Sequence, residues 1–295
     1  MPVFESKLDT KSESYAKNRA DQLEKLAHLR MLEGRAEAAS EKRRARFEER
    51  GQLTPRDRLA QLLDPGMPFL TLYNMASYCV DDPDRDTSIP GGSELAGIGY
   101  VSGVRCMVLV DDSGINAGAA TEMGFRKSME VMRIALTNKL PFGHVVESAG
   151  ANLMQYKVEL WAHGGGVFCS LGWLSAAGIP TMTVLHGPST AGGAYMPGMS
   201  DYNVGVKHNG MAALGGAALV QAATGEIADE RELGGSEMHA SVSGLIEYLA
   251  EDDRDGIRQI REVVGSIGWN AHCPPLPQHV FDEPLYDAEE ILGLV

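Results

Sequence analysis

The order of apolar and polar positions along this chain predicts alternating helices and strands. Leucines at helical spacing among Lys, Glu and Arg predict a helix within residues 15–50. Two β-rich runs joined at Ser102-Gly103 predict a hairpin over residues 95–111. Beyond residue 120, short apolar runs at residues 143–146 and 181–185 separate stretches with helical spacing. This alternation is typical of parallel strands joined by crossover helices, so we expect an α/β fold.

Changes of composition along the chain predict three regions. We expect a charged helical segment over residues 1–50, the main domain over residues 51–270, and a linker with the start of a second domain over residues 271–295. Within the main domain, the part after residue 216 is predicted to be mostly helical. Because the sequence stops soon after a proline-rich linker, we expect that the rest of the second domain is missing.

Composition also narrows the classes of partner. The formal net charge of −14 argues against nucleic acid or an anionic membrane surface. The four cysteines form no CxxC pair, and we expect Cys106 and Cys169 to pack as small hydrophobic side chains. No apolar run reaches the ~18 residues of a membrane span, and the N-terminus lacks a signal-peptide core. We therefore expect a cytoplasmic protein.

Two glycine-rich segments carry the most informative pattern. Each follows a predicted buried parallel strand, so both belong at the carboxyl edge of one sheet, where α/β folds bind ligands. Their small residues admit a ligand close to the backbone, and the N–H groups at a helix start lack intrahelical partners. Such N–H groups can form an oxyanion hole, whereas the alternative is that the glycines only permit close helix–sheet packing. The two segments are Ser148-Ala149-Gly150-Ala151-Asn152 and Ala191-Gly192-Gly193-Ala194-Tyr195.

Side chains with catalytic chemistry are scarce around these segments. Ser148 and Ser189 lack the GxSxG frame of a nucleophile elbow. The histidines have no metal-ligand spacing, and we interpret four of them as structural: His144, His163, His186 and His239. Glu147 is a candidate general base, although a hydrogen bond to neighbouring backbone is the favoured interpretation. We expect no metal site, and a base supplied by a second molecule.

In the two glycine-rich segments and in several others, the chain resembles the carboxyltransferase (beta) subunits of biotin-dependent acyl-CoA carboxylases. It is most similar to the methylcrotonyl-CoA and geranyl-CoA branch, over about residues 50 to 269. Any one matching segment alone would be weak evidence for the resemblance, but the segments together are specific to this family. These segments are residues 50–58, 63–70, 147–153, 175–180, 190–201, 222–226 and 232–239.

The resemblance implies a crotonase-like ββα superhelix that transfers a carboxyl group from carboxybiotin to acyl-CoA through a thioester enolate. Subunits of this family have two such domains, one for acyl-CoA and one for biotin, and active sites form between different subunits of an oligomer. By motif, the backbones of Gly192, Gly193, Ala149 and Gly150 would hold the oxyanion, and the biotin anion left by CO₂ release would take the α-proton. The implied partners are acyl-CoA, a biotin carboxylase and biotin carrier subunit, and a second carboxyltransferase domain.

The resemblance also implies which neighbours contact substrate and where this chain departs from the family. The expected substrate-binding residues are Ser148, Ala151, Asn152, Ala194 and Tyr195. The departures are Ala149 in place of a glycine, Asn116-Ala117-Gly118-Ala119 in place of a lysine and a Gly-Gly pair, and Gly216-Ala217-Ala218-Leu219-Val220-Gln221 in place of a Gly-Pro-Pro loop. They predict a reshaped acyl pocket.

Two other functions remain open. A free-standing enoyl-CoA hydratase or isomerase needs a carboxylate over the acyl carbons, and Glu147 is its only well-placed candidate. A non-catalytic assembly subunit is the second alternative. If the second domain forms a wall of the active site, an apolar face near Tyr195 and Met196 should be exposed in the isolated chain.

Overall fold

The computed structural model describes residues 4–150, 158–272, 280 and 282–294, and the chain divides into two compact units. The first unit combines residues 1–34 with residues 274–295. It contains most of the long helix α1 (Glu13–Glu41) and the 3-10 helix Ala288–Gly293. An ion pair between Arg19 and Glu289, 3.5 Å long, and a hydrogen bond from Asn18 Nδ2 to the Gly293 carbonyl oxygen join its two ends.

The second unit, residues 35–273, is built around one mixed sheet. Along the sheet the strand order is β1-β2-β3-β4-β5-β6-β8, and β7 pairs with β5. The pairs β1–β2 and β2–β3 are antiparallel, and all pairs from β3 onward are parallel. The strands are β1 (Leu70–Thr71), β2 (Glu94–Val101), β3 (Val104–Asp111), β4 (Phe142–Ser148), β5 (Thr181–Thr190), β6 (Tyr202–Val206), β7 (Met211–Ala213) and β8 (Tyr248–Ala250).

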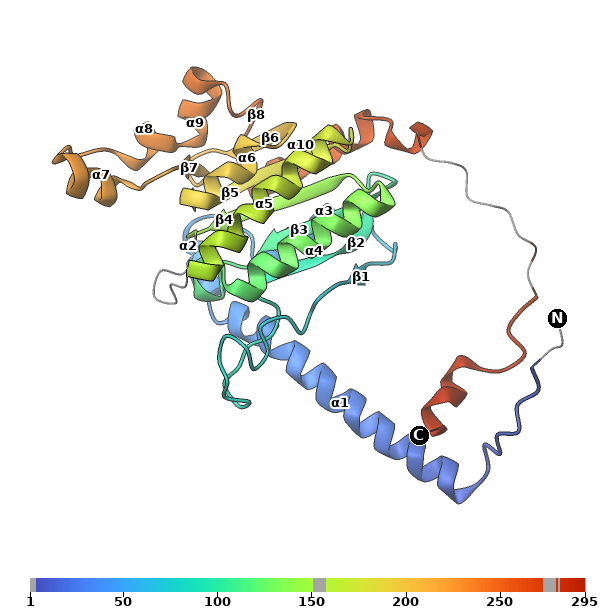
Figure 1. The fold of residues 1–295 in the computed structure, drawn as a ribbon. Coiled ribbons are helices and arrows are strands. Elements are labelled where there is room, and N and C mark those ends of the chain that lie inside the picture. The colour runs from blue at the N-terminus through green and yellow to red at the C-terminus, as the bar shows by residue number, and fades with distance from the viewer. Residues whose placement is uncertain (1–3, 151–157, 273–279, 281, 295) are drawn as a thin grey trace. The chain divides into compact units, whose positions relative to one another are not determined.

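Helices cover both faces of this sheet. Figure 1 shows α4 and α5 side by side over one face, where their apolar side chains pack. Helices α3 and α10 contribute to the apolar core of the other face. The helices of this unit are α2 (Arg44–Glu49), α3 (Pro55–Leu62), α4 (Glu122–Asn138), α5 (Val158–Ala176), α6 (Tyr195–Gly198), α7 (Ala217–Thr224), α8 (Glu230–Gly234), α9 (Ser236–Met238) and α10 (Asp253–Ser266).

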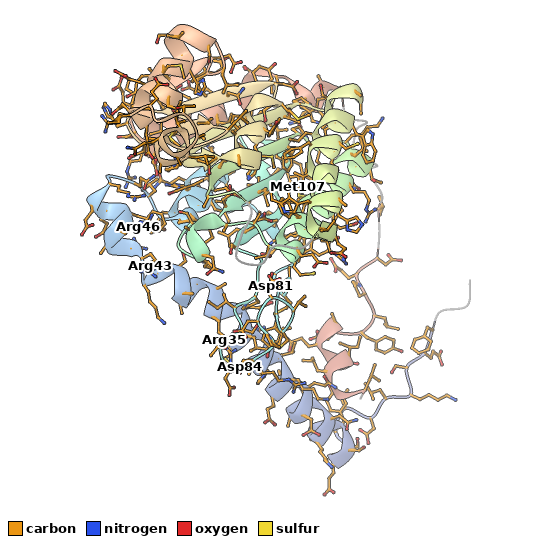
Figure 2. The ribbon with its side chains drawn as sticks, turned by 60° about the vertical axis from the view of Figure 1, so that its left-hand side comes forward. Arg35, Arg43, Arg46, Asp81, Asp84 and Met107 are labelled. Carbon is orange, nitrogen blue, oxygen red and sulfur yellow. The ribbon has the colours of Figure 1, made fainter. Side chains whose placement is uncertain are left out.

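Alternating side chains divide the core into two layers. On β3, Met107 and Leu109 pack towards α4 and α5, while Cys106, Val108 and Val110 pack towards α3 and α10. This is the period of two that a strand imposes on its side chains. Met107, fully buried near the middle of the sheet, is labelled in Figure 2. The strand is apolar on both faces because helices cover it on both sides.

At the start of this unit, a loop contacts the end of α1. Arg35 donates hydrogen bonds from Nη1 to the carbonyl oxygens of Arg85 and Ser88, at 2.6 and 3.4 Å. Figure 2 shows Arg35 beside the loop that carries Asp81 and Asp84. These bonds tether an irregular segment that has no strand of its own between β1 and β2 within the described residues.

Most elements predicted from the apolar pattern are confirmed, with one region wrong. The hairpin is β2–β3, the two parallel strands are β4 and β5, and the helical segments are α4 and α5. The prediction that the chain is mostly helical after residue 216 missed β8. The strands β6 and β7, which come just before residue 216, were not predicted either. These strands have only three to five residues. Such short segments, one of them containing Gly and Asn, show too little alternation to identify them.

The expectation for the cysteines is half right. Cys106 is buried in β3, but Cys169 is exposed on α5. Val167, Leu171 and Leu174 are the residues of α5 that face the core. Cys169 lies two positions after Val167, which on a helix turns it to the opposite side.

A buried arginine ties four elements together on the α3–α10 face. Arg58 of α3 is fully buried, and its guanidinium binds Glu147 of β4 at 2.6 Å and Asp253 of α10 at 2.9 Å. Asp253 also contacts Nδ1 of His186 in β5 at 2.8 Å and accepts a hydrogen bond from the Leu53 backbone N–H. Two buried carboxylates therefore share one buried cation, at the carboxyl ends of the two central strands.

This cluster predicts a large effect of removing Arg58. Arg58→Met leaves Glu147 and Asp253 buried without their cation, so we expect the free energy of unfolding to fall by about 3–5 kcal/mol. Arg126→Met is the control, because Arg126 forms an exposed pair with Glu122 on α4, and such pairs contribute under about 1 kcal/mol. Urea unfolding measures both variants. Equal losses for the two would show that Arg58 is not a structural clamp.

Candidate functional site

The structure brings the two glycine-rich turns together. β4 and β5 are parallel neighbours, and Ser148 lies opposite Ser189 in their register. A Cβ atom built on Gly193 would lie 3.5 Å from Cβ of Ser148, and one built on Gly150 would lie 3.1 Å from the Thr190 carbonyl oxygen. The turns are thus in van der Waals contact. Gly150 also has a φ of +79°, which favours glycine.

A third segment braces the first turn. Ser148 Oγ donates to the Gly118 carbonyl oxygen at 2.9 Å, and the Ala120 backbone N–H donates to the Gly150 carbonyl oxygen at 2.8 Å. Asn116 and Ala117 adopt φ values of 49° and 53°. Such left-handed conformations cost non-glycine residues roughly 1–2 kcal/mol each, so tertiary contacts hold this segment in place. The Asn116–Ala119 departure from the family pattern therefore lies directly against the turns.

The backbone N–H groups of the two turns are not equivalent. The Ala149 N–H donates to the Ala117 carbonyl oxygen at 3.3 Å, and the Gly150 N–H donates to Ser148 Oγ at 3.2 Å. The second turn is a 3-10 helix over Ala191–Ala194. In such a helix the first two N–H groups, here including Gly192, precede the first i→i+3 hydrogen bond. Gly192 is thus the donor that this helix geometry leaves open.

A cavity of about 220 Å³ opens beside both turns. It is lined by backbone of the turns, by aromatic and apolar side chains of α4 and α5, and by a group of polar side chains from the sheet. The lining residues are Glu94, Asp111, Ala120, Phe125, Ser128, His144, Ser148, Gly150, Trp161, Gly164, Gly165, Val167, Phe168, Ala191, Gly192, Gly193 and Met196. This combination of apolar walls and a few polar groups is typical of a small-molecule site.

The remaining predicted site residues are placed differently. Ala149 and Ala194 flank the cavity residues of their turns without lining it, among the described residues. The Tyr195 ring is 45% exposed and packs on Phe168, with ring centroids 4.9 Å apart. Ala151 and Asn152, predicted to bind substrate, lie outside the described residues.

Three polar residues of the cavity, Glu94, Asp111 and Ser128, were not predicted from the sequence, and His144 was interpreted only as structural. Glu94 Oε1 accepts a hydrogen bond from Ser128 Oγ at 2.9 Å, and His144 Nε2 contacts Asp111 Oδ1 at 3.0 Å. Burial raises the pKa of Glu94 to about 7, and burial also lowers the pKa of the neighbouring Lys127 to about 8. The sequence did hold one signal. Glu94 is charged, yet it lies two positions before Ala96 on the same strand, so its side chain points to the same inward face.

The structure gives the Glu147 carboxylate a partner that neither interpretation named. This carboxylate does not face the cavity, and its partner is the Arg58 guanidinium on the opposite face of the sheet. Strand alternation explains this placement, since Glu147 and Val145 share one face while His144 and Val146 share the other.

The structural interpretation of the histidines is confirmed for two of the four. His239 contacts Ser243 Oγ and the Ala212 carbonyl oxygen, both at 2.7 Å, and His186 Nδ1 binds Asp253, although His186 Nε2 has no partner among the described residues. His144 has one such partner but also lines the cavity. Among the described residues, no group of three His, Cys, Asp or Glu side chains could hold a metal ion, and no helix is long and apolar enough to cross a membrane.

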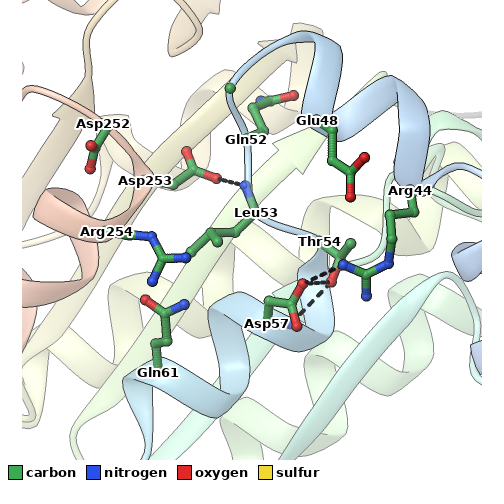
Figure 3. Close-up of a pocket in the computed structure, with 11 residues that line it drawn as sticks. Arg44, Glu48, Gln52, Leu53, Thr54, Asp57, Gln61, Asp252, Asp253 and Arg254 are labelled. Carbon is green, nitrogen blue, oxygen red and sulfur yellow. Dashed lines mark hydrogen bonds and ion pairs between the residues drawn. The ribbon is translucent and has the colours of Figure 1, made fainter.

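A second, polar cavity of about 420 Å³ lies at the N-termini of α3 and α10 (Figure 3). Thr54 caps α3 as predicted, and its hydroxyl donates to Asp57 at 2.7 Å. Arg44 pairs with the same carboxylate at 3.2 Å, and Asp253 accepts from the Leu53 N–H. Arg44, Asp57 and Asp253 thus have partners within the protein, which favours a structural role for these three residues.

The sequence matches one family over most of its length. Residues 46–295 match the carboxyl transferase domain. The chain belongs to this family. It is 45% identical over 251 residues to a probable biotin-dependent acyl-coenzyme A carboxylase beta2 subunit of Mycobacterium tuberculosis, covering 85% of this chain and 46% of that protein. It is 33% identical to the methylcrotonoyl-CoA carboxylase beta chain of Dictyostelium discoideum, covering 99% of this chain and 50% of that protein.

Solved structures give the same result. The beta subunit of Pseudomonas aeruginosa geranyl-CoA carboxylase matches with a TM-score of 0.90 and 46% identity, over 100% of this chain and 54% of that one. Transcarboxylase 12S matches with a TM-score of 0.72 and 27% identity, over 83% of this chain and 47% of that one. The resemblance seen in the sequence and the crotonase-like fold are confirmed. The carboxyl transferase chain spans about half the length of these relatives.

The raised pKa of Glu94 predicts a pH-dependent stability. A carboxyl group with a folded pKa above its ordinary value of 4.5 favours folding fully below pH 4.5 and loses that contribution as pH rises through about 7. Glu94→Gln cannot ionise, so we expect its stability relative to the wild type to rise by about 1–2 kcal/mol between about pH 5 and about pH 8.

Urea unfolding at several pH values measures this difference. Glu130→Gln is the matched control, since Glu130 is a half-exposed carboxylate of α4 that pairs with Arg133. The difference in unfolding free energy between Glu130→Gln and the wild type should change little with pH. If the difference between Glu94→Gln and the wild type were equally independent of pH, that result would contradict a buried, titrating Glu94.

Proposed function

We propose that this carboxyl transferase chain provides the acyl-CoA-binding half of the carboxyltransferase of a biotin-dependent acyl-CoA carboxylase. The observation that carries this proposal is the contact between the two turns, Ser148–Gly150 and Ala191–Ala194, at the mouth of an apolar cavity. Family membership supports the reaction, and the geometry supports the binding of a thioester. The acyl carbonyl would meet the turns, and the acyl chain would enter the cavity.

The backbone donors would stabilise the enolate that forms from the thioester. Gly192 supplies the donor that its 3-10 helix leaves open, and the Gly150 N–H could exchange its 3.2 Å bond with Ser148 Oγ for the oxyanion. Hydrogen bonds at catalytic sites are often long before substrate binds. One oriented donor of this kind contributes about 2.7–4 kcal/mol to lowering the barrier.

The apolar walls of the cavity would hold the acyl chain and exclude water from it. Phe125 of α4 and Val167 and Phe168 of α5 face the space beside the turns. Burying an acyl chain against them gains about 25 cal/mol per Å² of apolar surface. It also excludes water from the enolate, which strengthens the hydrogen bonds to its oxygen.

The proposal assigns the proton acceptor and the carboxyl donor to carboxybiotin carried by a partner subunit. Glu147, the candidate base for a hydratase, is bound to Arg58 on the other face of the sheet, so the structure offers less support for that alternative. We further propose a second carboxyltransferase domain, a homo-oligomer and a cytoplasmic location, by analogy with the carboxylase subunits among the relatives.

Exposed apolar side chains support a partner surface. Tyr195 is exposed as predicted, but Met196 is wrongly predicted, because it is 8% exposed and packs in the core. Further large apolar side chains are exposed near the carboxyl end of β7 and on the segment that follows. They are Leu214, Leu219, Ile227 and Val242. These residues are candidates for a surface that a partner covers.

The proposal is tested by reconstitution. The 295-residue chain is mixed with a separately produced second carboxyltransferase domain and a carboxylated biotin carrier protein, and transfer of labelled carboxyl to acyl-CoA is measured. We expect transfer by the mixture and little by the chain alone, because orientation of both substrates lowers the barrier by up to ~7–11 kcal/mol. Hydration of enoyl-CoA by the chain alone would instead support the hydratase function.

Gly193→Ala tests the packing of the second turn. A Cβ atom there would lie 2.7 Å from Ser189 Oγ, in the strand that leads into this turn, so the Ser189 hydroxyl or the turn itself must shift. We expect a loss of about ten- to hundredfold in carboxyl transfer with a smaller change in acyl-CoA affinity, since misplaced oxyanion donors act mainly in the transition state. Gly172→Ala on the exposed side of α5, where a Cβ meets nothing within 4 Å, is the control. Equal activity of the two variants would contradict the assigned role.

A further inference from the structure

The inner wall of the acyl cavity is polar. Glu94 of β2 lies opposite Asp111 of β3 in the strand register, and Asp111 contacts His144 of the next strand, β4. All three side chains lie on the sheet face covered by α4 and α5, as do Ala96, Leu109 and Val146 of the same strands. They form a continuous row across three strands, which we call the polar row.

The hydrogen bonds of the polar row are incomplete on the side of the cavity. Asp111 accepts from the Glu147 backbone N–H through Oδ2 and contacts His144 Nε2 through Oδ1. When Asp111 accepts through both oxygens, a His144 proton lies on Nε2, and Nδ1 is left to present a lone pair. Neither His144 Nδ1 nor Glu94 Oε2 has a hydrogen-bond partner among the described residues, although both atoms are buried.

The surroundings keep these two atoms in place. His144 is 4% exposed, and its ring is held by Asp111. Glu94 is held from α4, where Ser128 donates to its carboxylate and Lys127 Nζ donates to its backbone carbonyl oxygen at 2.5 Å. A ligand that reaches the polar row therefore meets two oriented polar atoms rather than mobile side chains.

The chemistry of the polar row selects among acyl chains. A hydrocarbon end would cover both atoms without replacing their hydrogen bonds, which is unfavourable for buried polar groups. A carboxylate end would add a third carboxyl group beside those of Asp111 and Glu94, and like charges disfavour such a group being ionised. A hydroxyl group is neutral and can donate to one atom while it accepts from the other when Glu94 is protonated.

We propose that this cavity recognises acyl-CoA esters whose acyl chain carries a hydroxyl group where it meets Glu94 and His144. The inference rests on the proposed function, because it assumes that the thioester occupies the turns that line the same cavity. Within that function, it assigns Glu94 and His144 to substrate specificity. The hydroxyl would complete the hydrogen bonds of the polar row.

The test compares matched esters on the 295-residue chain. A series of straight-chain acyl-CoA esters and their terminally hydroxylated counterparts of equal length is titrated by calorimetry. At the chain length that spans the cavity, we expect the hydroxylated ester to bind about tenfold or more tightly than its hydrocarbon counterpart, because a site with polar groups discriminates strongly against an analogue that leaves them unpaired. At shorter lengths the two esters should bind equally.

Two variants assign the preference to the polar row. Glu94→Leu and His144→Phe remove the hydrogen-bonding atoms, and we expect the ratio of the two dissociation constants to fall to about one or to invert in favour of the hydrocarbon ester. The ratio is measured on one sample, so partial unfolding of a variant changes both apparent titrations alike. Glu130→Gln on the outer side of α4 is the control and should keep the wild-type ratio.

The possible outcomes separate this inference from the proposed function. Equal binding of every matched pair by the wild type overturns the hydroxyl recognition and leaves acyl-CoA binding intact. Tightest binding of an ester with a terminal carboxylate also overturns it. An unchanged ratio in both variants overturns the assignment to Glu94 and His144. Failure of a folded wild-type sample to bind any CoA ester overturns the proposed function itself.

Discussion

The parallel pairing of β4 with β5 is the constraint on which the candidate site depends. The register that sets Ser148 opposite Ser189 makes both strands end together, so the turns that follow them must touch. Apolar helices on both faces keep these strands buried, and Arg58 on the α3–α10 face binds Glu147 at the end of β4 while Asp253 links it to His186 of β5. A shift of one residue in the register of β4 would turn each of its side chains to the opposite face of the sheet and bring Glu147 to the cavity face.

The two faces of the sheet carry different buried polar clusters. On one face, Arg58 pairs with both Glu147 and Asp253, while Arg58 Nη2 and His186 Nε2 have no hydrogen-bond partner among the described residues. On the other, Glu94 and His144 each keep a buried atom without a partner among the described residues, and both line the cavity. Incomplete hydrogen bonding is costly on either face, and beside a cavity a ligand can complete it, so Glu94 and His144 are the better candidates for ligand recognition.

Family membership explains the fold and the turns but not the shape of the acyl cavity. Apart from Ala149, the glycine-rich turns follow the pattern expected from the resemblance. The Asn116–Ala119 segment is an expected departure from it, and Asn116 and Ala117 adopt left-handed backbone conformations beside the first turn. The third expected departure includes Gly216, the N-cap of α7, and the first residues of that helix. Relatives whose names carry different acyl groups share this architecture, and the proposed source of specificity is the polar row.

The sequence by itself determined the layered α/β arrangement, the hairpin, the two central strands, the glycine-rich turns and the family. These features depend on local periodicity, on turn residues and on contiguous motifs, which are readable along a chain. Only the tertiary structure decided which face each polar side chain occupies. Glu147 and Glu94 look alike in sequence, yet one is neutralised by Arg58 and the other faces the cavity, because Arg58 and Ser128 come from helices distant in the chain. Short strands such as β7 and β8 were equally unreadable, since pairing with distant strands, rather than their own three residues, makes them strands.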